Sequence, residues 1–313
     1  MKTILRKIIT FFITVLLVTL FVFIAFELIP GDAATARLGI NATPEALARL
    51  REELGLTRPF FVRYFSWLYS FFFGDMGTST SYGVSVRSML AAKLPITLTL
   101  TIMTFLMVVL FSIPIGLLSS KYEDRFAAKA ADVLGQLSMS FPPFFLGILI
   151  TYVFGMCIKL FTPGGFVSYD VNFGKFLWYL VFPSLAIAIP KAAMSTKLLK
   201  TSILSERKLD YVRTAYSRGN STMDVLYRHV LKNAIIPVIT FLGMTLADIV
   251  AGSLVIEQVF SIPGYGRLLI SSIANRDYPV VQAIIAIIAM LVIIINLFVD
   301  ITYRILDPRL GGD

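Results

Sequence analysis

Long apolar runs alternate with shorter polar segments along the whole chain. A helix needs about 20 predominantly apolar residues to cross roughly 30 Å of hydrocarbon. Six runs meet that length: Ile8–Ile29, Ile96–Leu118, Val133–Ile158, Phe176–Thr196, Ala234–Ile256 and Val280–Tyr303. The pattern therefore predicts an all-α integral membrane protein with six transmembrane helices.

Two of these runs have alternative explanations. The first follows a basic start, as a signal peptide does, but it is longer than the roughly 7–15 apolar residues of a signal-peptide core, so we expect a retained helix. The fourth contains Pro183 and Pro190 and carries Lys191 near its end. Prolines are tolerated where neighbouring helices satisfy the freed backbone groups, and a terminal lysine can reach the interface. We therefore expect six spans rather than five.

The long segment 31–95, between the first two spans, has its own pattern. Thr43-Pro44-Glu45 is typical of a helix start, and leucines recur at helical spacing from there to Gly55. A second, aromatic helix is expected over Phe60–Phe73, ended by Gly74-Asp75-Met76-Gly77. The segment is expected to lie on the outer membrane face, either as a loop that caps the bundle or as a docking platform.

Composition and charge agree with a membrane protein. Hydrophobic residues make up 57% and charged residues 15% of the chain, and its mean hydropathy is +0.81, whereas a soluble domain carries roughly 25% charged residues. The net charge of +9 does not indicate nucleic-acid binding, because the basic residues lie mainly in segments between apolar runs. With both termini cytoplasmic, most of the 28 lysines and arginines fall on the inner side, as the positive-inside rule requires.

Little in the sequence predicts catalysis or metal binding. Cys157 is the one cysteine and His229 the one histidine, which excludes an intrachain disulfide and makes a His/Cys zinc site implausible. Phosphate-binding loop, nucleophile-elbow and zinc-protease motifs are absent from the sequence. We expect no metal and no cofactor on this chain and no enzymatic activity of its own.

The most distinctive stretch lies between the fourth and fifth runs. It reads DYVRTAYSRG from Asp210 to Gly219 and YRHVLKNAIIP from Tyr227 to Pro237. The pattern predicts a helix that ends near Gly219, a break, and a second helix that starts at Ser221 or Thr222. A generic basic loop is the alternative.

Several further motifs accompany this stretch in order. They are Pro30-Gly31-Asp32, Leu54-Gly55-Leu56, Gly74-Asp75-Met76-Gly77, the run from Glu257 to Arg267, the run from Arg276 to Gln282, and Leu306-Asp307-Pro308-Arg309. With these motifs, essentially the whole chain resembles the B-type permease subunit of ATP-binding-cassette (ABC) importers for dipeptides, oligopeptides and nickel.

The resemblance implies a type I ABC importer permease fold with both termini cytoplasmic. It divides the chain into an N-terminal tail and first helix (1–30), an extracytoplasmic segment (31–95), and a permease core with five spans (96–313) that includes a cytoplasmic coupling segment (197–233).

In that family the coupling motif rests on an ATPase subunit. The resemblance assigns this role to Arg213, Thr214, Ala215, Arg218 and Gly219. The general importer motif begins with Glu-Ala-Ala, whereas this chain has Arg213-Thr214-Ala215, and Lys232 replaces a proline that is found five residues later as Pro237. Both departures are similar to the peptide and nickel branch.

Asp248 lies in the middle of the fifth run and is a candidate for the translocation path. A charged side chain at a helix centre costs about 2.5–3.5 kcal/mol on insertion scales, so such residues are functional candidates by default. Gly243, Ala247 and Ala251 form a small-residue stripe beside it. Asp248 is therefore expected either to face the path, where it could meet a cationic group, or to form a hydrogen bond between packed helices.

Two further groups are expected near the outer face. Glu257, a second path candidate, lies just past the fifth run, and Glu27 lies at the outer end of the first; both could be hydrated interfacial carboxylates. Turn residues after Glu257 predict a gate loop, and a plain connector is the alternative. The resemblance places this loop near the contact with a binding protein. The gate candidates are Pro263, Gly264, Tyr265, Gly266 and Arg267.

The predicted function is that of a non-catalytic permease subunit in a bacterial-type inner membrane, working by alternating access. The expected partners are membrane lipid, a second related permease, two ATPase subunits that hold ATP and Mg²⁺, and an extracytoplasmic binding protein; nucleic acid is not expected. Peptides are favoured as substrate because they are commoner in the resembling group, with nickel or another small solute as the alternative. A secondary transporter or channel, and an intramembrane enzyme, are the competing classes.

Overall fold

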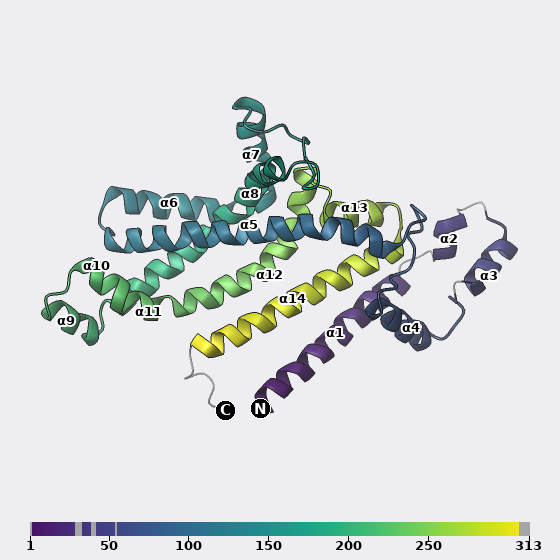
Figure 1. Ribbon diagram of the computed structural model, residues 1–313, viewed down its shortest axis with the longest axis horizontal. Coiled ribbons are helices and arrows are strands. Elements are labelled where there is room, and N and C mark those ends of the chain that lie inside the picture. The colour runs from purple at the N-terminus through teal and green to yellow at the C-terminus, as the bar shows by residue number, and fades with distance from the viewer. Residues whose placement is uncertain (1, 29–32, 39–41, 54, 307–313) are drawn as a thin grey trace. The chain divides into compact units, whose positions relative to one another are not determined.

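The structure, a computed structural model, describes residues 2–28, 33–38, 42–53 and 55–306 (Figure 1). The predicted motif Pro30-Gly31-Asp32, the leucine at 54 and the predicted motif residues 307–309 lie outside this range. The elements, with η marking π-helical turns, are α1 (Lys2–Leu28), α2 (Ala33–Leu38), α3 (Pro44–Glu53), α4 (Phe60–Phe72), α5 (Val86–Lys121), α6 (Phe126–Ser140), α7 (Pro143–Ile150), η1 (Thr151–Cys157), α8 (Phe173–Glu206), α9 (Asp210–Ser217), α10 (Thr222–Asp224), η2 (Val225–Val230), α11 (Leu231–Ala234), α12 (Ile236–Val259), α13 (Tyr265–Ala274) and α14 (Tyr278–Leu306).

The predicted all-helical membrane class is confirmed. Within the described residues, five helices are long and apolar enough to cross a membrane: α1, α5, α8, α12 and α14. A sixth span is formed only if the helix pair α6 and α7–η1 is counted as one. α8 continues through Pro183 and Pro190, so the prolines of the fourth run do not divide it.

The third predicted span is not one straight helix. The run Val133–Ile158 is divided at Phe141, and the helices on either side are bent by 106°. Phe141 is extended, with φ −94° and ψ 131°, because the ring of a following proline disfavours the helical conformation. Pro142 and Pro143 then start α7. The third predicted span is therefore a bent pair of helices and not one straight helix.

Two of the spanning helices are longer than a bilayer requires. α5 has 36 residues and α8 has 34, which at 1.5 Å per residue gives about 54 and 51 Å. The hydrocarbon layer is about 30 Å thick. α5 starts at Val86, well before the predicted Ile96, and α8 runs on to Glu206, beyond the predicted Thr196. Both helices therefore extend beyond the hydrocarbon.

The segment between α1 and α5 contains the two predicted helices, α3 and α4. The Thr43 hydroxyl accepts a hydrogen bond from the Ala46 amide at 3.3 Å, which caps α3. α4 packs on α1, where the Tyr64 hydroxyl lies 3.0 Å from Thr19 Oγ1. After α4 the chain turns at Gly74 and Gly77, with φ values of +88° and +79°, a backbone conformation that favours glycine.

The chain forms two compact units, each with its own packing. One comprises Met1–Thr97 with Pro263–Leu297, and the other comprises Leu98–Ile262 with Phe298–Asp313. In the second unit, α8 is the central helix and packs against α6, α7 and α12. The core there is close-packed: a Cβ at Gly116 of α5 would lie 2.9 Å from a methyl carbon of Leu199 of α8.

Candidate functional site

The candidate site is the segment from Arg207 to Ala234, which joins α8 to α12 and which we call the α9–α11 segment. It begins where the extended part of α8 ends. Arg207 Nη1 donates a hydrogen bond to the Ser120 carbonyl at 3.1 Å, so the ends of α8 and α5 are linked. The segment therefore starts from a fixed position at the end of two long helices.

Helix α9 is amphipathic, with a narrow buried side. Val212 and Ala215 are 0% and 5% exposed, and α9 packs against η2. Their spacing of three places both on one face of the helix. Arg213 and Thr214 lie on the exposed remainder. The small side chain of Ala215 allows α9 to lie close against the rest of the segment.

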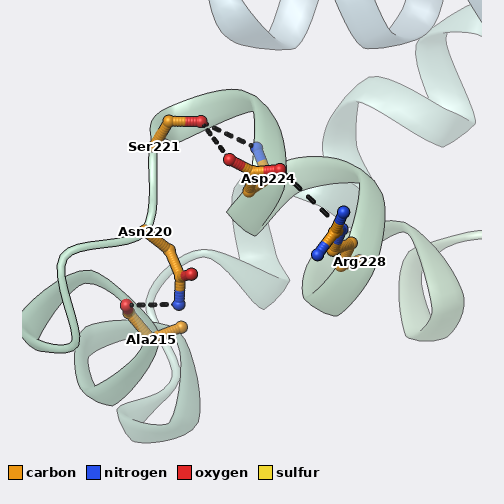
Figure 2. Close-up of polar contacts among 5 residues, drawn as sticks. All are labelled: Ala215, Asn220, Ser221, Asp224 and Arg228. Atoms are coloured by element: carbon orange, nitrogen blue, oxygen red, sulfur yellow. Dashed lines mark hydrogen bonds and ion pairs between the residues drawn. The ribbon is translucent and has the colours of Figure 1, made fainter.

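The predicted break after α9 is confirmed (Figure 2). Gly219 has φ +80°, and its amide donates to the Tyr216 carbonyl at 2.9 Å. Asn220 then turns back, and its Nδ2 donates to the Ala215 carbonyl at 3.0 Å. A left-handed residue followed by bonds to the last free carbonyls is a standard way of ending a helix.

The next helix starts at the residue that the sequence predicts. Ser221 Oγ accepts a hydrogen bond from the Asp224 amide at 3.2 Å and donates to Asp224 Oδ2 at 2.6 Å (Figure 2). Asp224 Oδ1 also lies 3.8 Å from Arg228 Nε. A serine cap with an acidic side chain in the first turn satisfies amides that would otherwise have no partner. The break is thus held on both sides by side-chain bonds.

The return path to the membrane is tied to α9 by Tyr211. Its hydroxyl donates to Glu206 Oε2 at 2.6 Å and accepts from Asn233 Nδ2 at 3.2 Å. Burial, and then the bond to the Glu206 carboxylate, raise the pKa of Tyr211. The neutral hydroxyl therefore joins the end of α8, α9 and α11, so that the segment forms one folded element.

A shallow cavity of about 300 Å³ opens beside α9. It is lined by Tyr211, Thr214, Ala215, Arg218, Asn220 and His229. Arg213 Nη1 lies 3.7 Å from Asp210 Oδ1, but both side chains are largely exposed, so this pair contributes little to stability. Arg213 and Arg218 therefore remain accessible to another protein.

The five predicted coupling residues come together in space. Arg213, Thr214, Arg218 and Gly219 are exposed, and Ala215 is buried beneath them. Three large side chains outside the predicted coupling residues, Tyr216, Met223 and Tyr227, are 38%, 38% and 51% exposed on the same segment. Exposed apolar side chains mark a protein contact only where they form a contiguous patch, since single ones are normal on a protein surface.

Asp248 forms an ion pair with Lys191, which is not among the predicted path residues. Its Oδ2 lies 2.7 Å from Nζ of Lys191 on α8. The side chains of Asp248 and Lys191 are 64% and 26% exposed. Close helix packing is found elsewhere on α12, since a Cβ on Gly243 would overlap Val299 of α14. A role in the path remains a prediction.

The expectation that the Glu257 carboxylate is hydrated is wrong, whereas its role in the path remains a prediction. α12 continues to Val259, so Glu257 lies inside the helix, and it is 0% exposed. No glycine or proline lies between the predicted end of the span at Ile256 and the end of α12 at Val259. Glu27 is exposed and forms an ion pair with Arg63, and its interfacial position remains a prediction.

The predicted gate loop is only partly a loop. α13 starts at Tyr265, so of the run from Pro263 to Arg267 only the first two residues precede a helix. Proline and glycine mark helix starts as well as loops. Tyr265 and Gly266 are buried, and the Tyr265 amide donates to Thr97 Oγ1 at 3.0 Å. Arg267 is the exposed member of the run, and a contact with a binding protein remains a prediction.

Asp277, just before α14, is a buried acidic residue of the motif from Arg276 to Gln282. Its carboxylate is fully buried and accepts hydrogen bonds from the Ser79 hydroxyl, from the Thr80 amide and hydroxyl at 3.0 and 3.1 Å, and from the Ser81 amide at 3.4 Å. It therefore fixes the turn that precedes α5. Within the described ranges, no three His, Cys, Asp or Glu side chains form a group that could hold a metal ion.

These features define a multi-pass, all-helical membrane protein with a folded segment beyond the ends of its longest helices. A family model described as binding-protein-dependent transport system inner membrane component matches residues 112–312, and a model of the N-terminal part of such components matches residues 1–101. The chain belongs to this family of transport permeases, which fits the predicted type I ABC importer permease fold.

Similar proteins match over nearly their whole length. A probable peptide ABC transporter permease of Sinorhizobium fredii is 32% identical, with 98% of both chains covered. The oligopeptide transport system permease AppB of Bacillus subtilis is 32% identical over 94% of both chains. The glutathione transport system permease GsiC of Salmonella choleraesuis is 32% identical over 98% of both chains.

Proposed function

We propose that this chain is the permease subunit of an ATP-driven importer that carries peptides across a bacterial-type inner membrane, with both termini in the cytoplasm. The names of its relatives support this substrate class: one is a peptide permease, one an oligopeptide permease, and one a permease for glutathione, which is itself a tripeptide. Agreement over nearly the full chain length supports the transfer of the role as a whole.

The observation that carries the mechanism is the fixed break between α9 and α10. α9 presents Arg213 and Arg218 outward on a helix held by packing and by the Asn220 and Ser221 bonds. A rigid, exposed element of this kind can transmit the movement of a partner protein without first having to be ordered. We assign this face to an ATPase subunit, which holds ATP and Mg²⁺.

The complete transporter then contains this chain, a second related permease, two ATPase subunits and an extracytoplasmic binding protein. Closure of the ATPases moves the α9–α11 segment and, through the linked ends of α8 and α5, shifts the permease between its inward-open and outward-open states. Such a shift requires that ATP bind one state more tightly than the other. The permease itself hydrolyses nothing and binds no cofactor.

Charge reversal on α9 tests this assignment. The variant R213E/R218E is assembled with its partners in proteoliposomes, and both ATP hydrolysis and peptide uptake are measured in the presence of loaded binding protein. We expect insertion into the membrane to be unchanged and uptake per ATP hydrolysed to fall sharply, because reversed charges repel the surface that the arginines contact.

The matched control is K208E/K232E. Lys208 and Lys232 are positions of the same segment outside α9, so the net charge changes equally while the α9 face is kept. Normal coupling in R213E/R218E, or equal loss in both variants, would contradict the assignment. If the transporter can be purified without any ATPase chain and still takes up peptide, a secondary transporter or channel would be favoured instead.

A further inference from the structure

The Lys191–Asp248 ion pair is unusual in its position. Asp248 is near the midpoint of the 24-residue helix α12, and Lys191 lies within the apolar part of α8. Both belong to the same compact unit, and 64% of the Asp248 side chain is accessible on its surface. The pair is therefore at membrane depth, between two helices, and open on one side.

An open ion pair at this depth cannot face lipid. Acidic and basic side chains within spans almost always face the bundle interior or a water-filled cavity, because hydrocarbon does not solvate them. The accessible side of the pair must therefore face other protein or a water-filled path, and not lipid. The helices α8 and α12 are also the two that the α9–α11 segment connects, so movement of that segment acts directly on the pair.

The chemistry of the pair selects a class of ligand. An ammonium group of a ligand can bind the Asp248 carboxylate, and a carboxylate of a ligand can bind the Lys191 ammonium. A molecule that carries both charges can therefore replace both partners at once. A metal cation would gain the carboxylate but be repelled by the neighbouring lysine. A peptide with free ends carries both charges.

We propose that Lys191 and Asp248 form an exchange site in the translocation path, where the ammonium end of a peptide binds Asp248 and its carboxylate end binds Lys191. The proposal rests on the proposed function and adds to it a binding site and a requirement for free peptide ends. The ends of a dipeptide are about 7 Å apart, whereas Nζ and Oδ2 are 2.7 Å apart. The pair must therefore open, and re-forms when the peptide leaves.

The competing peptide is placed on the inner side of the membrane, and its inhibition of uptake is measured. A competitor added outside would first be selected by the external binding protein. Proteoliposomes with the complete importer oriented right-side out are loaded internally with dialanine, and initial uptake of labelled peptide from loaded binding protein is recorded. Internal dialanine should slow uptake by occupying the inward-open site. N-acetyl-dialanine lacks the charged ammonium end, and dialanine amide lacks the charged carboxylate end. Each should need an internal concentration about tenfold higher for the same inhibition, because one charged contact is lost.

Two variants complete the test. K191M/D248N should lose the sensitivity to internal dialanine, and the charge-swapped K191D/D248K should regain it, because the swap restores both charges. The matched control is D132N/K200M. Lys200 of α8 and Asp132 of α6 form a similar pair, with Nζ and Oδ2 2.5 Å apart, and its removal should leave the dialanine effect unchanged.

Each outcome has one meaning. Equal inhibition by free and blocked dialanine, or undiminished inhibition in K191M/D248N, overturns the exchange site while uptake in the unmodified protein still supports the importer. A second result also overturns the exchange site. If K191M/D248N no longer assembles with the second permease, and the swapped variant assembles again but is not inhibited by dialanine, the pair forms a contact between the two permeases. Absence of any peptide uptake by the unmodified complex contradicts the proposed function itself.

Discussion

The turn at Gly219 provides a quantitative test of the coupling segment. Its φ of +80° places it in the left-handed region, and a Cβ built there would meet nothing within 4 Å. A substitution therefore changes only the backbone energy. A non-glycine residue in this region costs roughly 1–2 kcal/mol. With RT of about 0.59 kcal/mol, this cost lowers the population of the native turn by about 5–30-fold relative to competing turns.

The size of the effect should follow the tolerance of each side chain for positive φ. Asparagine enters the left-handed region more readily than alanine, and β-branched valine is the least tolerated. We therefore expect peptide uptake per ATP hydrolysed to fall in the order Gly219, G219N, G219A, G219V. The assay is the reconstituted importer with loaded binding protein, with melting temperature in detergent measured in parallel.

Gly164 offers a matched control. It has φ +74°, and a Cβ at this position would also meet nothing within 4 Å, but it lies between η1 and α8, away from the α9–α11 segment. G164A should therefore lower stability as much as G219A and leave uptake per ATP unchanged. Wild-type coupling in G219V, or the same loss of coupling in G164A, would refute the reasoning.

Three further predictions concern other parts of the chain. S221A removes the cap on the Asp224 amide and should destabilise the segment by about 1 kcal/mol, seen as faster hydrogen exchange confined to α10 and η2. D277N removes a buried acceptor and should lower stability by about 1–3 kcal/mol, measured by thermal unfolding; an unchanged melting temperature would contradict it. G243A should destabilise by about 1–3 kcal/mol through overpacking, and V299A in the same chain should restore much of the loss.

The apolar pattern predicted most of the helices because spanning length and hydrophobicity are local properties. It failed at Phe141, where the run stays apolar although the chain bends by 106°. Hydropathy does not register that Pro142 and Pro143 prevent the preceding residue from being helical. The start of α5 at Val86 lies outside the predicted span because Arg87 and Lys93 interrupt the apolar run in its first turns.

The candidate site was predictable where it depends on local backbone chemistry. Gly219 and Ser221 are recognisable as a helix end and a helix start from their residue types alone. The pairing of Lys191 with Asp248 joins residues far apart in the sequence, and the burial of Glu257 depends on how α12 packs. Neither is encoded in a local pattern, so both required the three-dimensional arrangement.

The length of α8 determines how far a small rotation is amplified. From Pro190 to Glu206 the helix continues for 16 residues, about 24 Å at 1.5 Å per residue. Prolines are the usual sites of helix bends above roughly 20°, and a change of that size at Pro190 would carry the far end of the helix by about 8 Å. α8 is thus a lever whose pivot lies directly beside Lys191 and whose far end carries the α9–α11 segment.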